Sequence, residues 1–191
     1  MLVASGANRR KLTVPGAEEF DQKGLTYCAT CDGWFFKDKD VIVVGGGDSA
    51  LEEGLFLTRY AKMVTIVHRR DSLRAGAVLQ NRAINHPKVQ FLYNTVLTEI
   101  SGEDAVKAVS LKNVVTGEIT ERQTDGIFIF IGHTPNTQLF EGQLEMREGG
   151  YILVDPLMQT NIPGVFVAGE AADPNFRQVI TSAGMGAAGK V

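Results

Sequence analysis

The sequence has 191 residues, of which 44% are hydrophobic and 21% charged, a composition typical of a soluble globular protein with one or two domains. Its net charge of −3 gives no reason to expect nucleic acid or an anionic membrane as a partner. No apolar run approaches the length of about 20 residues that crosses a bilayer, and no secretion signal is visible, so we expect a cytoplasmic protein.

The first chemical feature along the chain is a pair of cysteines, Cys28 and Cys31, the two cysteines of the sequence. Their spacing is typical of a redox dithiol, in which one thiolate attacks a partner's disulfide and the other resolves the mixed species. Asp32 follows directly and can exchange a proton where thiolate charge forms. Two inert thiols paired by chance are one alternative. A structural zinc site is another, but it needs two more Cys or His ligands at suitable spacing, so we expect no metal.

The next part of the chain alternates between strand and helix patterns. A β-branched run at 41–44 predicts a buried parallel strand, which Gly45-Gly46-Gly47 ends. A helical pattern then covers 49–60, a second strand 63–68 and a second helix about 73–85. This order is that of a βαβ series, and it predicts an α/β fold of Rossmann-like type with a parallel sheet.

Four short β-rich runs follow, and they predict an antiparallel β-meander inserted in the α/β domain. They cover residues 89–93, 96–100, 106–112 and 118–123, with a turn at 116–117. Residues 127–131 then resume the buried sheet. A further strand at 165–168 and a helix from about residue 177 complete the pattern.

Gly45, Gly47 and Ala50 have the spacing of a dinucleotide-binding fingerprint between a strand and a helix. The first glycine permits the tight turn, the second lets the backbone approach a pyrophosphate, and Ala50 allows close helix–strand packing. Free N–H groups at the start of the helix then face the phosphates. Taken alone, these residues are also compatible with a plain strand-to-helix turn.

Gly184, Gly186 and Gly189 repeat the same glycine spacing near the end of the sequence. They lie inside a helical segment with no preceding strand, so we interpret them as glycines that serve helix packing.

A basic run follows the second predicted strand, at the place where an NAD site usually has an acid on the ribose 2′-hydroxyl. It consists of His68, Arg69 and Arg70, with Arg74 four residues further on. Arginine binds a 2′-phosphate through two hydrogen bonds, so the run predicts NADPH rather than NADH. A solvated basic patch is the alternative interpretation.

Together these motifs resemble bacterial low-molecular-weight thioredoxin reductase. The resemblance rests on Cys-Ala-Thr-Cys-Asp-Gly at 28–33, Gly-Gly-Gly-Asp-Ser-Ala at 45–50 and His-Arg-Arg-Asp-x-x-Arg at 68–74. It continues with Ile-Gly-His-x-Pro-Asn-Thr at 131–137, Ile-Pro-Gly-Val-Phe-x-Ala-Gly at 162–169 and Arg-Gln-x-x-Thr-Ser-Ala-Gly at 177–184. The motifs keep the family's order over essentially the whole chain.

The resemblance implies a flavoenzyme, usually a homodimer, that passes electrons from NADPH through FAD to its own disulfide and then to thioredoxin. In such an enzyme Cys31 would face the flavin, Cys28 would attack thioredoxin, and Asp32 would be the acid/base partner. Family positions around NADPH match Ser49, His68, Arg69, Arg70, Arg74, Ile131 and Tyr151, and we assign Asp48 to the same site. Positions that approach FAD match Glu170, Arg177, Gln178, Val179 and Ile180.

The resemblance also implies a domain organisation. Residues 11–138 would form the NADPH domain with the Cys pair, and residues 1–10 and 139–191 would be partial FAD-domain segments. The sequence shows no counterpart of the family's first Rossmann unit, so it resembles the back two-thirds of such an enzyme, and we expect FAD to be held by the intact enzyme but not by this chain alone. Glu170 stands where the family usually has Asp. Two alternatives stay open: an isolated NADPH-binding module without turnover, and a related flavin-dependent disulfide reductase such as the flavin subunit of a peroxide-reducing system.

Overall fold

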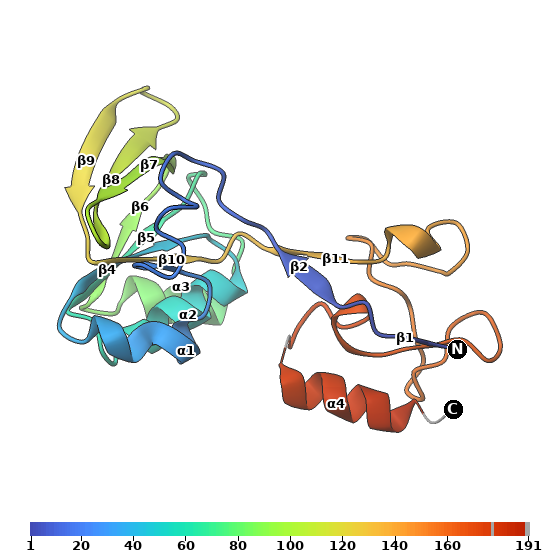
Figure 1. Cartoon of the computed structure of the whole chain (residues 1–191). Helices are drawn as coiled ribbons and strands as arrows, with labels where there is room; N and C mark the ends of the chain where they lie inside the picture. Colours follow the sequence, from blue (N-terminus) through green and yellow to red (C-terminus); the bar gives the residue numbers. More distant parts are fainter. Residues whose placement is uncertain (177, 190–191) are drawn as a thin grey trace. The chain divides into compact units, whose positions relative to one another are not determined.

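The computed structural model describes residues 1–176 and 178–189, which form two compact units. Unit 2 is the continuous stretch Lys11–Ile131, and unit 1 combines Met1–Arg10 with Gly132–Val191. Figure 1 shows the elements of each unit along the chain. Each unit has a hydrophobic core of its own, so each is described separately.

Unit 2 is built on a five-stranded parallel sheet in the order β3-β10-β4-β5-β6. Its strands are β3 (Leu25–Thr26), β4 (Asp40–Val44), β5 (Met63–Val67), β6 (Val89–Leu92) and β10 (Gly126–Ile129). Every neighbouring pair in this sheet runs parallel. The predicted α/β fold with a parallel sheet is therefore confirmed.

Helices cover one face of this sheet (Figure 1). They are α1 (Ala29–Asp32), the 3-10 helix η1 (Gly33–Phe36), α2 (Asp48–Leu57) and α3 (Ala77–Ile84). The sequence of α2 explains its orientation, because its apolar positions recur at helical spacing and Leu51, Gly54 and Leu57 are buried while Glu52 is exposed.

The predicted meander covers the opposite face of the sheet. It has three antiparallel strands, β7 (Thr95–Gly102), β8 (Val106–Asn113) and β9 (Ile119–Gln123). Gly117 lies in the turn between the last two with a φ of +76°, a conformation that glycine adopts without strain.

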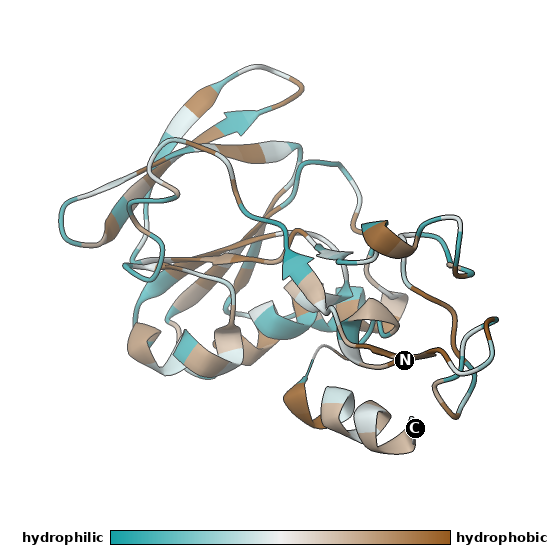
Figure 2. Cartoon of the chain, turned by 45° about the vertical axis from the view of Figure 1, so that its right-hand side comes forward, coloured by the Kyte–Doolittle hydropathy of each residue, from teal (hydrophilic) through white to brown (hydrophobic). Residues whose placement is uncertain are grey.

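The strands of this sheet are largely hydrophobic (brown in Figure 2), as expected for a sheet that is covered on one face by helices and on the other by the meander. Along β10 the side chains alternate between the two cores: Phe128 packs on the helix side, whereas Ile127 and Ile129 pack on the meander side. In β4, Val41 and Val43 face the helices while Ile42 faces the meander.

Two expectations from the sequence are wrong in detail. Residues 89–93 do not belong to the meander: β6 pairs in parallel with β5, Val64 opposite Val89, and Val89 packs on the helix-side core. The helix expected from 73 begins at Ala77, because backbone hydrogen bonds from Arg74 and Ala75 to Gly46 O hold the preceding residues as a loop.

Unit 1 has shorter elements. β1 (Leu2–Val3) pairs in parallel with β12 (Phe166–Val167), and β2 (Ala7–Arg9) pairs antiparallel with β11 (His133–Pro135). Its helical elements are η2 (Gln138–Phe140), η3 (Gly169–Ala171) and α4 (Val179–Ala188). Val3, Ile152 and Val167 are at the centre of its core, and no residue of α4 is fully buried. Of the helices in the described part of the chain, none has the length and apolar character to cross a membrane.

The core of unit 2 yields a stability prediction. Phe128 is fully buried and meets Phe36 edge-on, with ring centroids 5.1 Å apart. We expect Phe128→Ala to lower the free energy of unfolding by about 3–5 kcal/mol, because it leaves a cavity between sheet and helices. Urea denaturation measures this loss. The matched control is Phe35→Ala, at a position 69% exposed, and an equal loss in both variants would contradict the assignment of Phe128 to the core.

Candidate functional site

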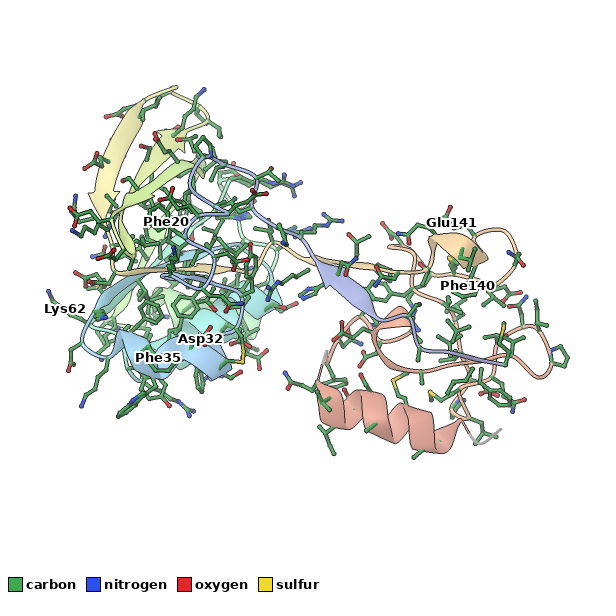
Figure 3. The ribbon with its side chains drawn as sticks, viewed as in Figure 1. Phe20, Asp32, Phe35, Lys62, Phe140 and Glu141 are labelled. Atoms are coloured by element: carbon green, nitrogen blue, oxygen red, sulfur yellow. A yellow bond between two sulfur atoms is a disulfide. The ribbon has the colours of Figure 1, made fainter. Side chains whose placement is uncertain are left out.

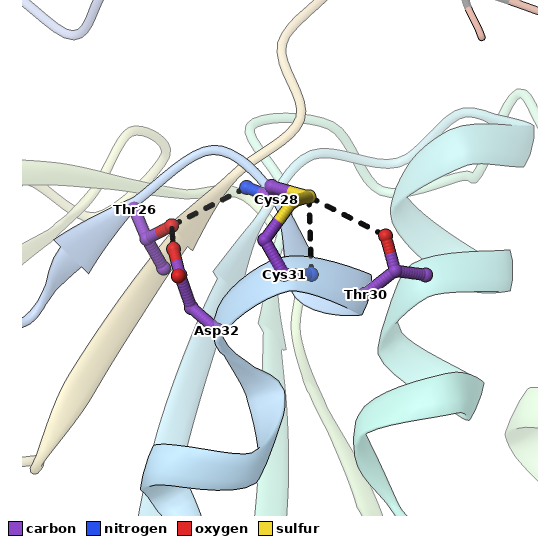
Figure 4. The surroundings of a disulfide bond; sticks show 5 residues. All are labelled: Thr26, Cys28, Thr30, Cys31 and Asp32. Carbon is purple, nitrogen blue, oxygen red and sulfur yellow. Dashed lines mark hydrogen bonds between the residues drawn. A yellow bond between two sulfur atoms is a disulfide. The ribbon is translucent and has the colours of Figure 1, made fainter. Parts of the chain in front are cut away.

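Cys28 and Cys31 form a disulfide at the carboxyl end of β3, with their Cα atoms 5.3 Å apart (Figure 4). Cys28 immediately precedes α1, and the first turn of α1 returns the chain so that Cys31 meets it. Cys31 is exposed and Cys28 half-buried. The two sulfurs are therefore paired as their spacing predicts, at the surface of unit 2.

Hydrogen bonds converge on the Cys28 sulfur. The backbone N–H of Cys31 donates to it at 3.2 Å, and the hydroxyl of Thr30 lies 3.3 Å away and donates as well, since a disulfide sulfur carries no hydrogen. Donors directed at a sulfur favour its thiolate over its thiol when the disulfide opens.

Thr26 links the disulfide to Asp32. Its buried hydroxyl accepts a hydrogen bond from the Cys28 N–H at 3.3 Å and donates to Asp32 Oδ2 (Figure 4). The carboxylate predicted to exchange protons is thus held beside the cysteines by a residue that the sequence analysis missed. The available signal was a hydroxyl two residues before the first cysteine, matched by Thr30 two residues after it.

Two large aromatic side chains follow the dithiol in η1. Trp34 is 63% exposed and Phe35 69% exposed. Trp34 meets Tyr60 edge-on at 5.8 Å, whereas Phe35 lies free at the surface near Asp32 (Figure 3). Exposed aromatic residues of this size beside a reactive disulfide are typical of a protein-docking surface.

The glycine turn lies between β4 and α2, as predicted. A Cβ on Gly45 would lie 2.5 Å from Phe130 O and 2.7 Å from the Cβ of Ala50, so both residues must be small. A Cβ on Gly47 would meet nothing within 4 Å. Gly47 precedes α2 without any side-chain cap on the helix. The backbone there is open to an approaching anion.

Gly46, the middle glycine, has a role that the fingerprint spacing does not specify. A Cβ at this position would lie 2.2 Å from Nδ1 of His68, so the imidazole ring lies directly against the Gly46 backbone. His68 is 6% exposed, and its Nε2 donates to the carbonyl of Ser72 at 3.1 Å.

Burial lowers the pKa of His68 below its usual value, and although the bond to Ser72 opposes this, the positive charges of Arg74, Arg70 and Arg69 lower it further. The ring is therefore neutral near pH 7. His68 contributes packing to this site, and the arginines contribute the positive charge.

Arg69, Arg70 and Arg74 are exposed, and no ion pair within residues 1–176 and 178–189 involves them. Their loop is held by its backbone: Arg74 N donates to Gly46 O at 2.7 Å, and Asn94 N donates to Arg70 O at 3.0 Å. The loop thus presents unpaired guanidinium groups next to the open glycine turn.

The remaining predicted residues of this site differ in position. Ser49 is half-buried in the first turn of α2, and the Asp48 side chain accepts a hydrogen bond from Gly76 N at 2.7 Å. Ile131 ends unit 2 and packs on the meander-side core. Tyr151 is buried in unit 1, so its assignment to the nucleotide site remains a prediction.

The residues assigned to FAD lie in unit 1. Glu170, in η3, lines a cavity of about 550 Å³ together with Ser5, Asn8 and Ser182. Gln178 precedes α4, and Val179 and Ile180 are 88% and 78% exposed. Arg177 lies outside the described residues.

The three glycines that repeat the fingerprint spacing near the end of the sequence do not lie at a strand-to-helix turn. Gly184 and Gly186 lie inside α4, and Gly189 caps its end. In the described residues, η3 rather than a strand precedes this helix, so the glycines lie in a helical segment as expected. The expected role in helix packing is wrong for Gly184 and Gly186, because a Cβ at either position would meet nothing within 4 Å.

Comparison with known proteins agrees with this geometry. Residues 1–186 match the pyridine nucleotide-disulphide oxidoreductase family. The chain is 47% identical to a thioredoxin reductase of Streptomyces coelicolor over 100% of its own length and 60% of the relative's. It is 50% identical to that of Chlamydia pneumoniae over 97% and 61%.

Among solved structures, thioredoxin reductase from Lactococcus lactis is 46% identical, with a TM-score of 0.80 over 98% of this chain and 62% of that one. The chain thus spans about 60% of the length of the relatives it matches.

The glycine turn yields a matched pair of substitutions. Gly46→Ala places a methyl group against His68, and we expect it to lower the free energy of unfolding by about 1–3 kcal/mol. Gly47→Ala meets open space and should change stability by less than about 0.5 kcal/mol. Urea denaturation of both variants distinguishes the positions; equal stability of the two would show that His68 does not pack on Gly46.

Proposed function

The chain belongs to the pyridine nucleotide-disulphide oxidoreductase family, and from this premise we propose that it carries the NADPH site and the redox dithiol of a thioredoxin-disulfide reductase. The observation that carries the proposal is the joint presence, on one parallel sheet, of a surface disulfide and an open glycine turn beside unpaired arginines. The similarity to thioredoxin reductases supports the choice of thioredoxin as the substrate.

The nucleotide half of the proposal concerns unit 2. Gly47 and the uncapped start of α2 suit the pyrophosphate, because they offer free N–H groups and no side chain in the way. Arg69, Arg70 and Arg74 suit a 2′-phosphate, since they are exposed and make no ion pair with any described residue. The site therefore fits NADPH better than NADH.

The flavin half of the proposal concerns unit 1. The cavity lined by Glu170, Ser5 and Asn8 offers polar groups suited to FAD, and the exposed residues Gln178, Val179 and Ile180 are assigned to the same cofactor by family resemblance. When bound, FAD supplies the hydride-accepting chemistry that a dithiol lacks.

The dithiol performs thiol–disulfide exchange. In its reduced form, the Cys28 thiolate attacks one sulfur of the partner's disulfide, which forms a mixed disulfide and releases the partner's other sulfur as a thiolate. The Cys31 thiolate then attacks the Cys28 sulfur, so the Cys28–Cys31 disulfide forms and the partner leaves with two thiols. Asp32, held by Thr26, exchanges the protons that the departing thiolates require.

The donors directed at Cys28 support its role as the attacking sulfur, because they stabilise negative charge there. Trp34 and Phe35 support a protein as the substrate, since they extend an exposed aromatic surface from the disulfide. We place this function in the cytoplasm, because a catalytic Cys pair suits a reducing compartment, and we expect a homodimer, as the family resemblance implies.

The nucleotide assignment has a direct test. We expect the double variant Arg69→Ala and Arg70→Ala to lose roughly 100-fold in affinity for NADPH relative to NADH, because hydrogen bonds to a charged group contribute about 1.5–3 kcal/mol each. Calorimetric titration measures both affinities. Arg82→Ala, which removes a basic residue of α3, should leave their ratio unchanged; equal losses for both cofactors in the double variant would refute the 2′-phosphate assignment.

The dithiol assignment is tested by trapping. Thioredoxin whose single remaining active-site cysteine carries thionitrobenzoate is mixed with reduced Cys31→Ser or Cys28→Ser chain. Cys28, in the first variant, should displace thionitrobenzoate and form a stable mixed disulfide about tenfold faster than Cys31 in the second. Absorbance of the released thionitrobenzoate follows the rate of each reaction. Equal rates for the two cysteine variants would contradict the role of Cys28.

Adding Phe35→Ala to the Cys31→Ser variant tests the docking surface. This change should slow the trapping of thioredoxin. It should not slow the reaction with free dithiobis(nitrobenzoate), because this small-molecule disulfide does not need the exposed aromatic surface of the protein.

A further inference from the structure

Asp48 makes a contact that neither the fingerprint nor a role in cofactor binding explains. It begins α2, yet its side chain does not cap that helix. Its Oδ1 instead accepts a hydrogen bond at 2.7 Å from the backbone N–H of Gly76, which lies 28 residues further along the chain. Gly76 precedes the first residue of α3 and has no side chain with which to cap it. The Asp48 carboxylate therefore joins the starts of two helices.

The segment that this contact holds is the basic loop, residues 69–76, which carries the three arginines. Its end is fixed to the glycine turn by Arg74 N and Ala75 N, which donate to Gly46 O at 2.7 and 3.2 Å, and then by Asp48. Inside the loop, the Ser72 carbonyl is fixed by His68. Of these contacts, the one from Asp48 is made by a side chain of α2, so it ties the loop to the helix that faces the nucleotide.

The charge of Asp48 also argues against a role as a ligand. A carboxylate in the first turn of α2 would repel a pyrophosphate at the start of that helix. Its hydrogen bond directs the negative charge to the Gly76 N–H, away from the helix's own free N–H groups. The sequence analysis assigned Asp48 to the cofactor site; the geometry gives it a different task there.

We propose that Asp48 is a positioning residue for cofactor discrimination. Through Gly76 it fixes the basic loop relative to the glycine turn, so that the arginines are already in position when the 2′-phosphate binds. This inference rests on the proposed NADPH site. Because preorganised groups lose less entropy on binding, loosening the loop should weaken NADP⁺ binding more than NAD⁺ binding.

The test compares three variants of the chain. Asp48→Ala removes the acceptor, and Asp48→Asn keeps an oxygen for the Gly76 N–H while it removes the charge. Asp71→Ala removes an equal charge inside the basic loop without touching the tie. Calorimetry gives the affinities for NADP⁺ and NAD⁺, and amide hydrogen exchange at Gly76 reports the tie in nucleotide-free protein.

We expect Asp48→Ala to lower the NADP⁺ to NAD⁺ affinity ratio about tenfold and to speed exchange at Gly76, while Asp48→Asn keeps both close to wild type. Asp71→Ala should not lower the ratio. If the wild-type chain prefers NADP⁺ over NAD⁺ and Asp48→Ala keeps that preference, the proposed role of Asp48 is wrong. It is also wrong if Asp48→Asn lowers the NADP⁺ to NAD⁺ affinity ratio as much as Asp48→Ala does. A wild-type chain that binds NADP⁺ no better than NAD⁺ would instead overturn the NADPH assignment itself, and the inference with it.

Discussion

The turn at Gly45 and Gly46 brings the elements of unit 2 together at distances that leave no room for a side chain. Gly45 passes between Phe130 O and Ala50, which lets β4, β10 and α2 meet, and its N–H donates to Val67 O at the end of β5. Gly46 lies against His68, and its carbonyl accepts the hydrogen bonds that hold the basic loop. The start of α2 and the position of the basic loop therefore both depend on this one stretch of close-packed backbone.

The same sheet accounts for the second chemical group. In a parallel sheet all carboxyl ends lie at one edge, so the disulfide after β3 and the glycine turn after β4 lie on the same side of unit 2. One strand, β10, separates them, which corresponds to about 10 Å between the ends of β3 and β4 at the usual strand spacing. This edge thus holds the proposed nucleotide site and the cysteine pair on one rigid support. A dithiol does not readily take a hydride from nicotinamide, which is why the proposed function also needs the flavin assigned to unit 1.

Local patterns were sufficient to predict β4, α2 and β5, because a buried β-branched run, a glycine turn and an amphipathic helix are all written in consecutive residues. Local patterns failed where the structure of a segment depends on a partner that is distant in the sequence. The strand at 89–92 is a short β-rich run, as the meander strands are, and only its pairing with β5 places it in the parallel sheet. The hydrogen bonds of Thr26 with Asp32 and of Asp48 with Gly76 could not be predicted from the sequence either. A hydroxyl or carboxylate group does not indicate which N–H or oxygen will be its hydrogen-bond partner.

The two units differ in how well they can hold a site in advance. The sheet of unit 2 is buried between two cores, so its loops start from fixed strand ends. Unit 1 has two-residue strands in β1 and β12 and a small core, and α4 contributes no fully buried residue to it. Fewer buried apolar contacts mean a smaller free energy for local opening. The dithiol and the arginines are therefore positioned by unit 2 itself, whereas Glu170 and the first turn of α4 depend on a much smaller core, which a bound cofactor would stabilise by mass action.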